Sequence, residues 1–249
     1  MSDSASIVSK APAAPALPGA VTRERLDNGL EVVLIDNPVA PIVTTVLYYR
    51  AGTRDEARAR GGTAHFLEHM MFKGSGNYGP GEVDELTQRM GGANNAFTSH
   101  DTTAYYFQFA SDRWHIALDI EASRMAGLTL DSAQVDLERN VILEEIAMYD
   151  ADPWSALDSE VSRVLFQGEG YGLPVLGTRQ ELAEIDGGVL GDFHRSFYVP
   201  ARAVRVVAGD LSPGRERALE AVAQRFSSLA GGDAARSVAP GMAPGGGLE

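Results

Sequence analysis

The sequence predicts an α+β fold in which helices cover a sheet made mainly of antiparallel strand pairs. A tight hairpin is indicated around Asp27-Asn28-Gly29, because polar and apolar residues alternate on both sides and Asn-Gly accepts the positive φ of a short turn. Three strand-like segments precede the first helix, and four helices of the second half follow one another without intervening strands. This order favours an antiparallel-rich sheet over a doubly wound parallel one.

The first half of the chain contains five of the predicted strands and two helices. Residues that are β-branched or aromatic indicate the strands, whereas apolar residues at i and i+4 indicate helices that glycines end. In chain order, we expect a hairpin over residues 21–37, a strand over 41–52, helices over 62–72 and 80–90, and two strands within 93–110.

The second half is predicted to be mainly helical. Asp112 and Asp131 are expected to be N-caps, and Thr178 with Glu181 matches the spacing of a capping box. In chain order, we expect helices over 112–126, 131–149, 153–166 and 178–196, a buried strand over 203–209, and a last helix opened by Ser212-Pro213.

A single domain is expected over residues 21–230, because the chain is long enough for one large core and shows no internal repeat. We interpret residues 1–20, rich in Ala, Pro and Ser, as a flexible arm that lacks the features of a secretory signal. Residues 231–249 are expected to be a flexible tail whose closing Gly-Gly-Gly-Leu-Glu resembles a cloning remnant. Taken at face value, the missing signal predicts a cytoplasmic protein, whereas a trimmed sequence would allow a periplasmic one.

Composition restricts the partners and the metal chemistry. A formal net charge of -13 repels phosphate backbones, so we expect no nucleic-acid partner. No apolar run approaches the roughly 20 residues that a membrane helix needs, so we expect no membrane partner either. Because the chain has no cysteine, a zinc site would have to use histidine and carboxylate ligands.

Two of the five histidines lie within one predicted helical turn, in the segment His65-Phe-Leu-Glu68-His69. Residues at i and i+4 project from one helix face, so His65 and His69 are spaced as two ligands of one metal ion. Glu68 lies at the rim of the same face, where it can reach a water bound to such a metal. The alternative is a pair of helical histidines with ordinary core or surface contacts.

A catalytic zinc site usually has three protein ligands and an open position, so one more ligand is needed. The predicted helix over 131–149 offers Glu138 and Glu145, which are seven residues apart and share a face beside an apolar stripe that includes Val141. Glu144 is turned about 100° away and is expected to face solvent. The alternative is a surface helix that is merely rich in glutamate.

Several segments resemble the M16 family of metalloproteases, the inverzincin group that includes pitrilysin, insulin-degrading enzyme and the mitochondrial processing peptidase. They are LDNGLEVVLIDNP, AGTRDE, GGTAHFLEHMMFKGS, GGANNAFTSHDTTAYY, ERNVILEEIAMY, YGLPVLGTRQEL and FYVPARAVRVVAGD, and they cover about residues 22–212. The inverted His-x-x-Glu-His signature is the specific part. The resemblance implies the N-terminal catalytic half of such an enzyme, with an M16 or LuxS-like metallohydrolase fold.

The resemblance also assigns roles to individual residues. It implies that the ligands of a Zn²⁺ ion are His65, His69 and Glu145. It further implies that Glu68 is the general base, and that Glu138 is an acid close to the site that does not bind the metal itself.

For the substrate, the resemblance points to the segment that follows Gly91-Gly92. It implies that a peptide adds to this strand edge, with Asn95 and Ala96 supplying main-chain or amide contacts. The alternative is an ordinary edge strand protected by polar side chains.

The implied function is a zinc-dependent endopeptidase that cleaves unfolded peptides or short polypeptides. M16 enzymes place a second, similarly folded half against this one, and no segment after residue 212 resembles it. We therefore expect the partner to be another M16-type domain or subunit, or a second copy of the chain. The alternative function is a non-catalytic scaffold or peptide-binding subunit.

Overall fold

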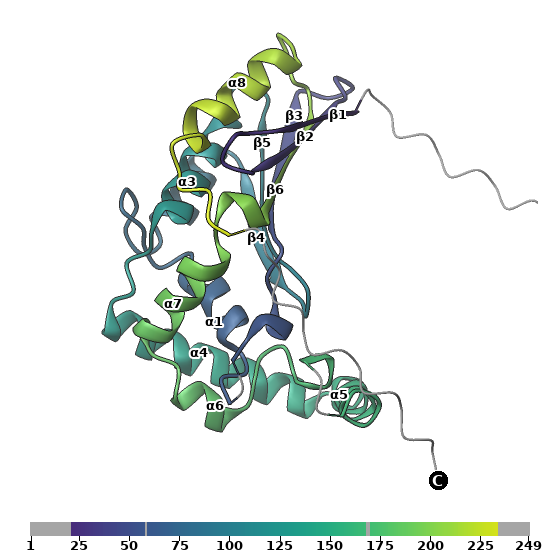
Figure 1. Ribbon diagram of the computed structural model, residues 1–249, viewed down its shortest axis with the longest axis vertical. Helices are drawn as coiled ribbons and strands as arrows, with labels where there is room; N and C mark the ends of the chain where they lie inside the picture. Colours follow the sequence, from purple (N-terminus) through teal and green to yellow (C-terminus); the bar gives the residue numbers. More distant parts are fainter. Residues whose placement is uncertain (1–20, 58, 168–169, 234–249) are drawn as a thin grey trace, which may run out of the picture.

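The computed structural model describes residues 21–57, 59–167 and 170–233 (Figure 1). The predicted arm over 1–20 and residues 234–249 of the predicted tail lie outside the described residues. The strands are β1 (Val21–Arg25), β2 (Glu31–Asp36), β3 (Ile42–Tyr49), β4 (Ala93–Thr98), β5 (Thr103–Ala110) and β6 (Ala203–Gly209). The α-helices are α1 (Thr63–Met70), α2 (Glu82–Arg89), α3 (His115–Ala126), α4 (Ser132–Ala151), α5 (Pro153–Leu165), α6 (Arg179–Ala183), α7 (Gly187–Phe197) and α8 (Arg215–Phe226).

The described strands form one six-stranded sheet in the order β1-β2-β6-β3-β5-β4. Every neighbouring pair is antiparallel except β2 and β6, which run parallel. The predicted α+β fold with an antiparallel-rich sheet is therefore confirmed. Strand β6 lies between β2 and β3, so residues 31–36 pair with residues 204–209.

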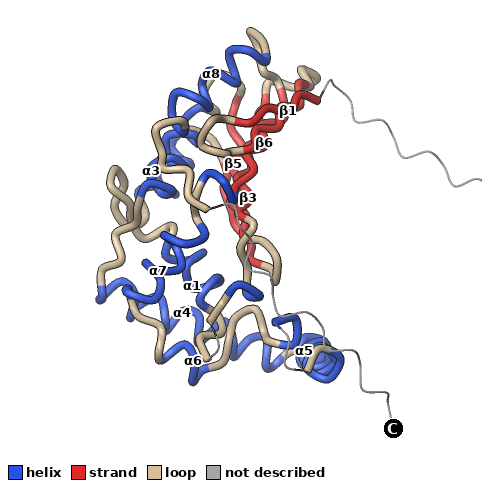
Figure 2. The backbone as a smooth tube through the Cα atoms, in the orientation of Figure 1, coloured by secondary structure: helices blue, strands red, loops and turns tan. Residues whose placement is uncertain are grey.

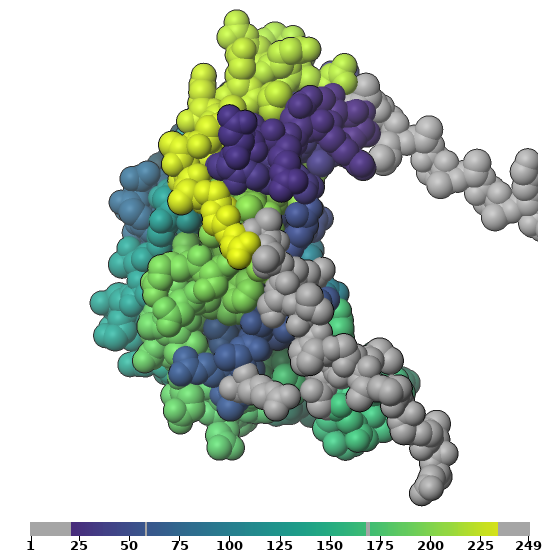
Figure 3. Space-filling model, viewed as in Figure 1, coloured from purple at the N-terminus to yellow at the C-terminus, as the bar shows by residue number. Residues whose placement is uncertain are grey.

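The predicted hairpin turn joins β1 to β2. Gly29 has a φ of 93°, in the left-handed region that glycine adopts without strain. The neighbouring Asn28 donates from Nδ2 to the carbonyl oxygens of Phe226, at 2.7 Å, and Leu229, at 3.2 Å. These bonds fasten the hairpin to the segment after α8, and Figure 3 shows the two lying together at one end of the molecule.

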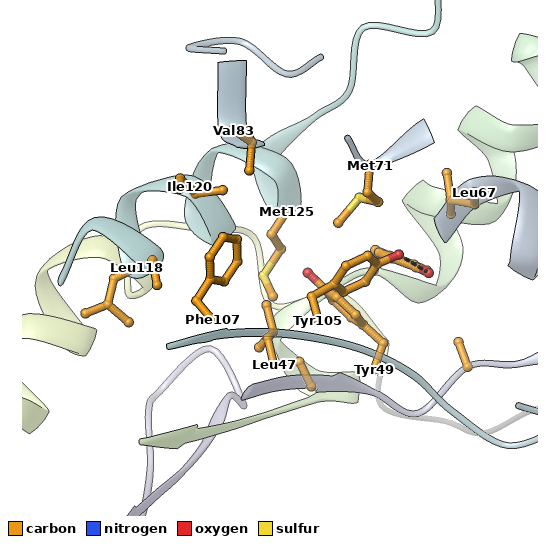
Figure 4. Close-up of a cluster of buried hydrophobic side chains, with 14 of the residues drawn as sticks. Leu47, Tyr49, Leu67, Met71, Val83, Tyr105, Phe107, Leu118, Ile120 and Met125 are labelled. Carbon is orange, nitrogen blue, oxygen red and sulfur yellow. Dashed lines mark hydrogen bonds between the residues drawn. The ribbon is translucent and has the colours of Figure 1, made fainter. Parts of the chain in front are cut away.

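Helices cover one face of the sheet, with α3, α7 and α8 on the same side (Figure 2). Alternate residues of β3 point into this layer, as the pleat of a strand requires, and Leu47 and Tyr49 are fully buried. In Figure 4, Phe107 rises from the sheet toward Ile120 and Met125 of α3. The core therefore lies between this face of the sheet and the helix layer.

A pair of buried charges lies within this core. Arg124 and Glu121 of α3 form an ion pair at 2.8 Å, and both side chains are fully buried. Arg205 of β6 is fully buried too, and within the described residues none of its guanidinium nitrogens has a hydrogen-bond partner. Burial lowers the pKa of Arg205 to about 10, against the attraction of Glu121.

Helix α3 begins later than the sequence predicts. Asp112 does not cap it, because the carboxylate of Asp112 accepts from Arg113 at 2.7 Å and 2.8 Å, and the cap position belongs to Trp114. The other predicted cap is confirmed, since the side chain of Asp131 accepts from the amides of Ala133 and Gln134.

The single helix predicted over 178–196 is wrong, because the structure divides it into α6 and α7. The capping box of Thr178 and Glu181 is present, but α6 is only 5 residues long. Asp186 then accepts from Val189 N at 2.9 Å and starts a new helix. The carbonyl oxygens of Leu182 and Ile185, released by the break, both accept from Arg139 of α4.

Helix α5 stands apart from the core. None of its residues is buried, and Trp154 and Leu165 are 78% and 70% exposed. Across the described part of the chain, no helix has both the length and the apolar character needed to cross a bilayer.

Candidate metal centre

Helix α1 carries the two paired histidines. Its N-terminus is held in place by a glycine in the left-handed conformation and by a carboxylate that accepts hydrogen bonds from its first amides. Gly62 precedes it with a φ of 87°, and a Cβ at this position would lie 2.4 Å from the carbonyl oxygen of Leu176. The carboxylate of Glu56 accepts from Gly62 N at 3.0 Å and from Ala64 N at 2.7 Å. Burial raises the pKa of Glu56 to about 8, although these two backbone bonds oppose the rise. Glu56 was not predicted as a cap, because it lies well before the helix.

The structure brings three of the predicted site residues together. Nε2 of His65 and Nε2 of His69 each lie 3.6 Å from Oε2 of Glu145. The three potential ligand atoms all lie within 4.8 Å of one another. Helix α1 supplies both imidazoles and α4 supplies the carboxylate, so the cluster depends on the packing of these two helices.

Glu138 does not belong to the group of three potential ligands but contacts one of them, His69. Its Oε1 accepts from Nδ1 of His69 at 2.8 Å, and its Oε2 is paired with Nζ of Lys73 at 2.7 Å. A hydrogen bond at Nδ1 sets the tautomer in which Nε2 is free to bind a metal. Lys73 was not predicted as part of the site, because its contact with Glu138 joins segments that are far apart in the chain.

Burial and charge act differently on the two imidazoles. Burial lowers the pKa of His65 to about 4, and the neighbouring His69 acts in the same direction. Burial also opposes protonation of His69, but the hydrogen bond with Glu138 and the nearby carboxylate of Glu145 outweigh it and raise the pKa of His69 to about 9. The close contact with His69 lowers the pKa of Glu145, so this carboxylate is ionised.

The donor set fits a zinc ion. Two imidazole nitrogens and a carboxylate oxygen are ligand types that Zn²⁺ takes in catalytic sites, and their mutual separations allow one cation to contact all three. The Glu138 contact with His69 supplies the carboxylate partner that metal-binding histidines usually have. Their assignment as zinc ligands remains a prediction.

Glu68 faces the same region but lies outside the group of three. Thr98 of β4 donates from Oγ1 to Oε2 of Glu68 at 2.5 Å. Burial raises the pKa of Glu68, and the Thr98 hydrogen bond opposes the rise. Thr98 was not predicted as a site residue, although it lies in the same strand as Asn95 and Ala96.

Strand β4 forms one end of the sheet and pairs with β5 along only one of its sides. Asn95 is exposed and Ala96 is half-buried, and both belong to this edge strand. Helix α1 packs next to β4, so the edge lies beside the histidine cluster. The role of these two residues in substrate binding remains a prediction.

One detail of the predicted helix over 131–149 is wrong. Val141, placed in the apolar stripe that faces the core, is 51% exposed, whereas Ile142 and Ile146 are buried. Val141 therefore does not belong to the buried stripe of this helix, although it lies one turn before Glu145. Glu144 is exposed, as predicted.

Comparisons with known proteins agree on one family. The family model described as Insulinase (Peptidase family M16) matches residues 31–179. YmxG of Bacillus subtilis, described as an uncharacterized zinc protease, is 35% identical over 192 residues, which are 77% of this chain and 47% of that protein. The mitochondrial-processing peptidase subunit beta of Lentinula edodes is 31% identical, over 82% of this chain and 43% of that protein.

A solved structure gives the same result. A protease from Helicobacter pylori matches with a TM-score of 0.82 and 27% identity, over 91% of this chain and 54% of that one. The chain spans about half the length of the curated relatives it matches.

Proposed function

The chain belongs to the insulinase family of peptidases, M16, and from that membership we propose that it is a zinc-dependent endopeptidase acting on unfolded peptides or short polypeptides. One observation carries the proposal: His65, His69 and Glu145, from two separate helices, place their ligand atoms within 4.8 Å of one another. Three such groups leave a position open for water or substrate, as a catalytic zinc site requires.

The protein's own side chains have distinct tasks in this proposal. Nε2 of His65, Nε2 of His69 and the carboxylate of Glu145 would hold the zinc ion. When bound, zinc would lower the pKa of a water molecule far below its value in bulk water, to about 7, and would polarise the carbonyl of the peptide bond. Glu138 and Lys73 keep the His69 ring in its orientation.

We assign proton transfer to Glu68. Its Oε2 is occupied by the hydroxyl of Thr98, so Oε1 is the atom that takes a proton from the attacking water. The same atom then returns that proton to the nitrogen of the leaving amine. Glu68 moves the proton without binding the metal.

The substrate lies along β4 in this proposal. An extended peptide would add to the free side of the strand, with Asn95 and Ala96 supplying amide and main-chain contacts. Main-chain pairing tolerates many side chains, which suits a peptidase of unfolded segments. A second M16-type domain or subunit, or a second copy of this chain, would close over the bound peptide.

Metal analysis tests the proposal. We expect about one zinc per chain, lost in His65→Ala and in His69→Ala but retained in His115→Ala, a histidine on α3. Glu68→Gln should keep the zinc and lose peptide hydrolysis in the full-length protein or complex that contains this chain. Full activity of Glu68→Gln would overturn the assignment of the base.

The alternative is a non-catalytic peptide-binding subunit. In that case the zinc-loaded wild type would bind unfolded peptides without cleaving them, and Glu68→Gln would leave peptide affinity unchanged. Zinc-dependent turnover by the wild-type protein excludes this alternative.

A further inference from the structure

Thr98 contacts the carboxylate that we assign as the base. Its Oγ1 lies 2.5 Å from Oε2 of Glu68, and the hydroxyl must donate, because an ionised carboxylate only accepts. Hydrogen bonds to charged groups are shorter and stronger than neutral ones. The contact therefore restrains the orientation of the Glu68 carboxylate.

Thr98 is itself held firmly. It is the last residue of β4 and pairs in register with Thr103 of β5. Thr103 is fully buried, donates from Oγ1 to the carbonyl oxygen of Ala51 at 3.1 Å, and lies 3.4 Å from Thr98 Oγ1. A side chain supported in this way on a strand holds its partner more accurately than one on a loop.

The location of Thr98 connects two parts of the site. The same strand carries Asn95 and Ala96, the residues that we assign to the substrate, three and two positions earlier. Glu68 lies on α1, between the two histidines that we assign to the metal. The hydrogen bond donated by the Thr98 hydroxyl thus connects strand β4, to which we assign the substrate, directly to helix α1, to which we assign the metal.

On the basis of the proposed function, we propose that Thr98 is a positioning residue. It orients the Glu68 carboxylate and holds it at a fixed position relative to a peptide bound along β4. With Oε2 fixed by Thr98, Oε1 points to one defined place. Without the hydroxyl, the carboxylate can rotate about its last side-chain torsion, which has a broad energy profile. Small displacements of a reacting group are costly, roughly 100-fold in rate for about 1 Å.

Two substitutions at the same position separate orientation from packing. Thr98→Val removes the hydroxyl and keeps the shape, whereas Thr98→Ser keeps the hydroxyl. Thr44→Val is the matched control, because Thr44 is a half-buried strand residue whose hydroxyl accepts only a 3.4 Å contact from Gln108.

The kinetic test uses the full-length protein or complex that contains this chain, loaded with zinc. We expect Thr98→Val to lower kcat roughly 10-fold to 100-fold, with KM within about twofold of wild type and zinc content unchanged. Thr98→Ser should recover most of kcat, and Thr44→Val should retain it. A Thr98→Val variant with wild-type kcat, or a Thr98→Ser variant as slow as Thr98→Val, would overturn the proposal.

A second measurement does not depend on activity. In urea unfolding of the metal-free chain, Thr98→Val should lower the midpoint in the wild-type background and shift it less than half as much in a Glu68→Ala background. Equal shifts in both backgrounds would show that the two side chains do not interact. If the wild type lacks zinc-dependent hydrolysis, the proposed function fails, whereas this cycle still decides whether Thr98 holds Glu68.

Discussion

Oε1 of Glu138 lies 2.8 Å from Nδ1 of His69, on the opposite edge of the ring from Nε2, which faces Glu145. The ring of His69 therefore lies between two carboxylates. Glu138 orients the ring, and Glu145 is the other potential ligand that faces it. Lys73 extends the arrangement by one more ion pair, at 2.7 Å from Glu138. Zinc affinity should therefore depend on residues that do not touch the metal.

Removing the orienting carboxylate should weaken zinc binding. We expect Glu138→Gln to lower zinc affinity by about 10-fold to 100-fold, because the bond that sets the His69 tautomer is weakened. Lys73→Met should act in the same direction with a smaller effect. Competition with a chromogenic chelator measures both, and Glu144→Gln, an exposed residue beside Glu145, is the control. Wild-type affinity in Glu138→Gln would show that the ring is held by packing alone.

The stability of the protein should fall as pH rises from about 4.5 to about 8, in part because of Glu56. Burial raises the folded-state pKa of Glu56 from 4.5 to about 8, so in this window the folded state binds more protons than the unfolded state. The contribution is complete below pH 4.5 and is lost as pH rises through 8, on the order of 3–6 kcal/mol. Urea unfolding across this range should give a flatter profile for Glu56→Gln. Parallel profiles would contradict the prediction.

The buried guanidinium of Arg205 should cost stability. Arg205→Met replaces a buried charge that has no hydrogen-bond partner among the described residues with an apolar side chain, and we expect the free energy of unfolding to rise by about 1–3 kcal/mol. Arg124→Met is the comparison, because it strands the buried Glu121 and should lower that free energy by about 3–5 kcal/mol. Urea unfolding at one pH measures both. Destabilisation by Arg205→Met would indicate that bound water satisfies the guanidinium.

Two glycines at helix starts separate backbone strain from steric conflict. Gly62 and Gly81 have φ angles of 87° and 78° before α1 and α2, so alanine at either position is strained by about 1–2 kcal/mol. A Cβ at Gly62 would also lie 2.4 Å from Leu176 O, whereas none of the described atoms lies within 4 Å of a Cβ at Gly81. Gly62→Ala should therefore lower the melting temperature much more than Gly81→Ala. Equal losses would show that the Leu176 segment moves away freely.

Most of the fold follows from local patterns in the sequence. The Asn28-Gly29 turn, the Asp131 cap and the capping box of Thr178 all appear where spacing and residue type predict them. Two of the errors arose where another side chain changed the start of a helix. Arg113 binds the carboxylate that would have capped α3, and Asp186 begins a second helix where one continuous helix was predicted.

For the site, the sequence predicted the potential metal ligands but not the residues that support them. Spacing within one helix indicated that His65 and His69 share a face, and the family resemblance selected Glu145 from the glutamates of α4. Lys73 and Thr98 could not be found in this way, because each contacts a residue of another segment, and these contacts exist only once the helices and the sheet have packed together. Glu56 could not be found because it caps the helix from six residues before Gly62 and not from the cap position itself.

The position of β6 has a consequence for how the protein is made. Residues 203–209 leave the ribosome after every other described strand, yet they fill the gap between β2 and β3. A nascent chain shorter than this holds the β1-β2 hairpin and the β3-β5-β4 strands as separate pieces, each with an unpaired inner edge. Pairing of residues as distant in the chain as Glu31 and Val204 makes assembly slow, so the incomplete chain is the form in most need of protection from aggregation.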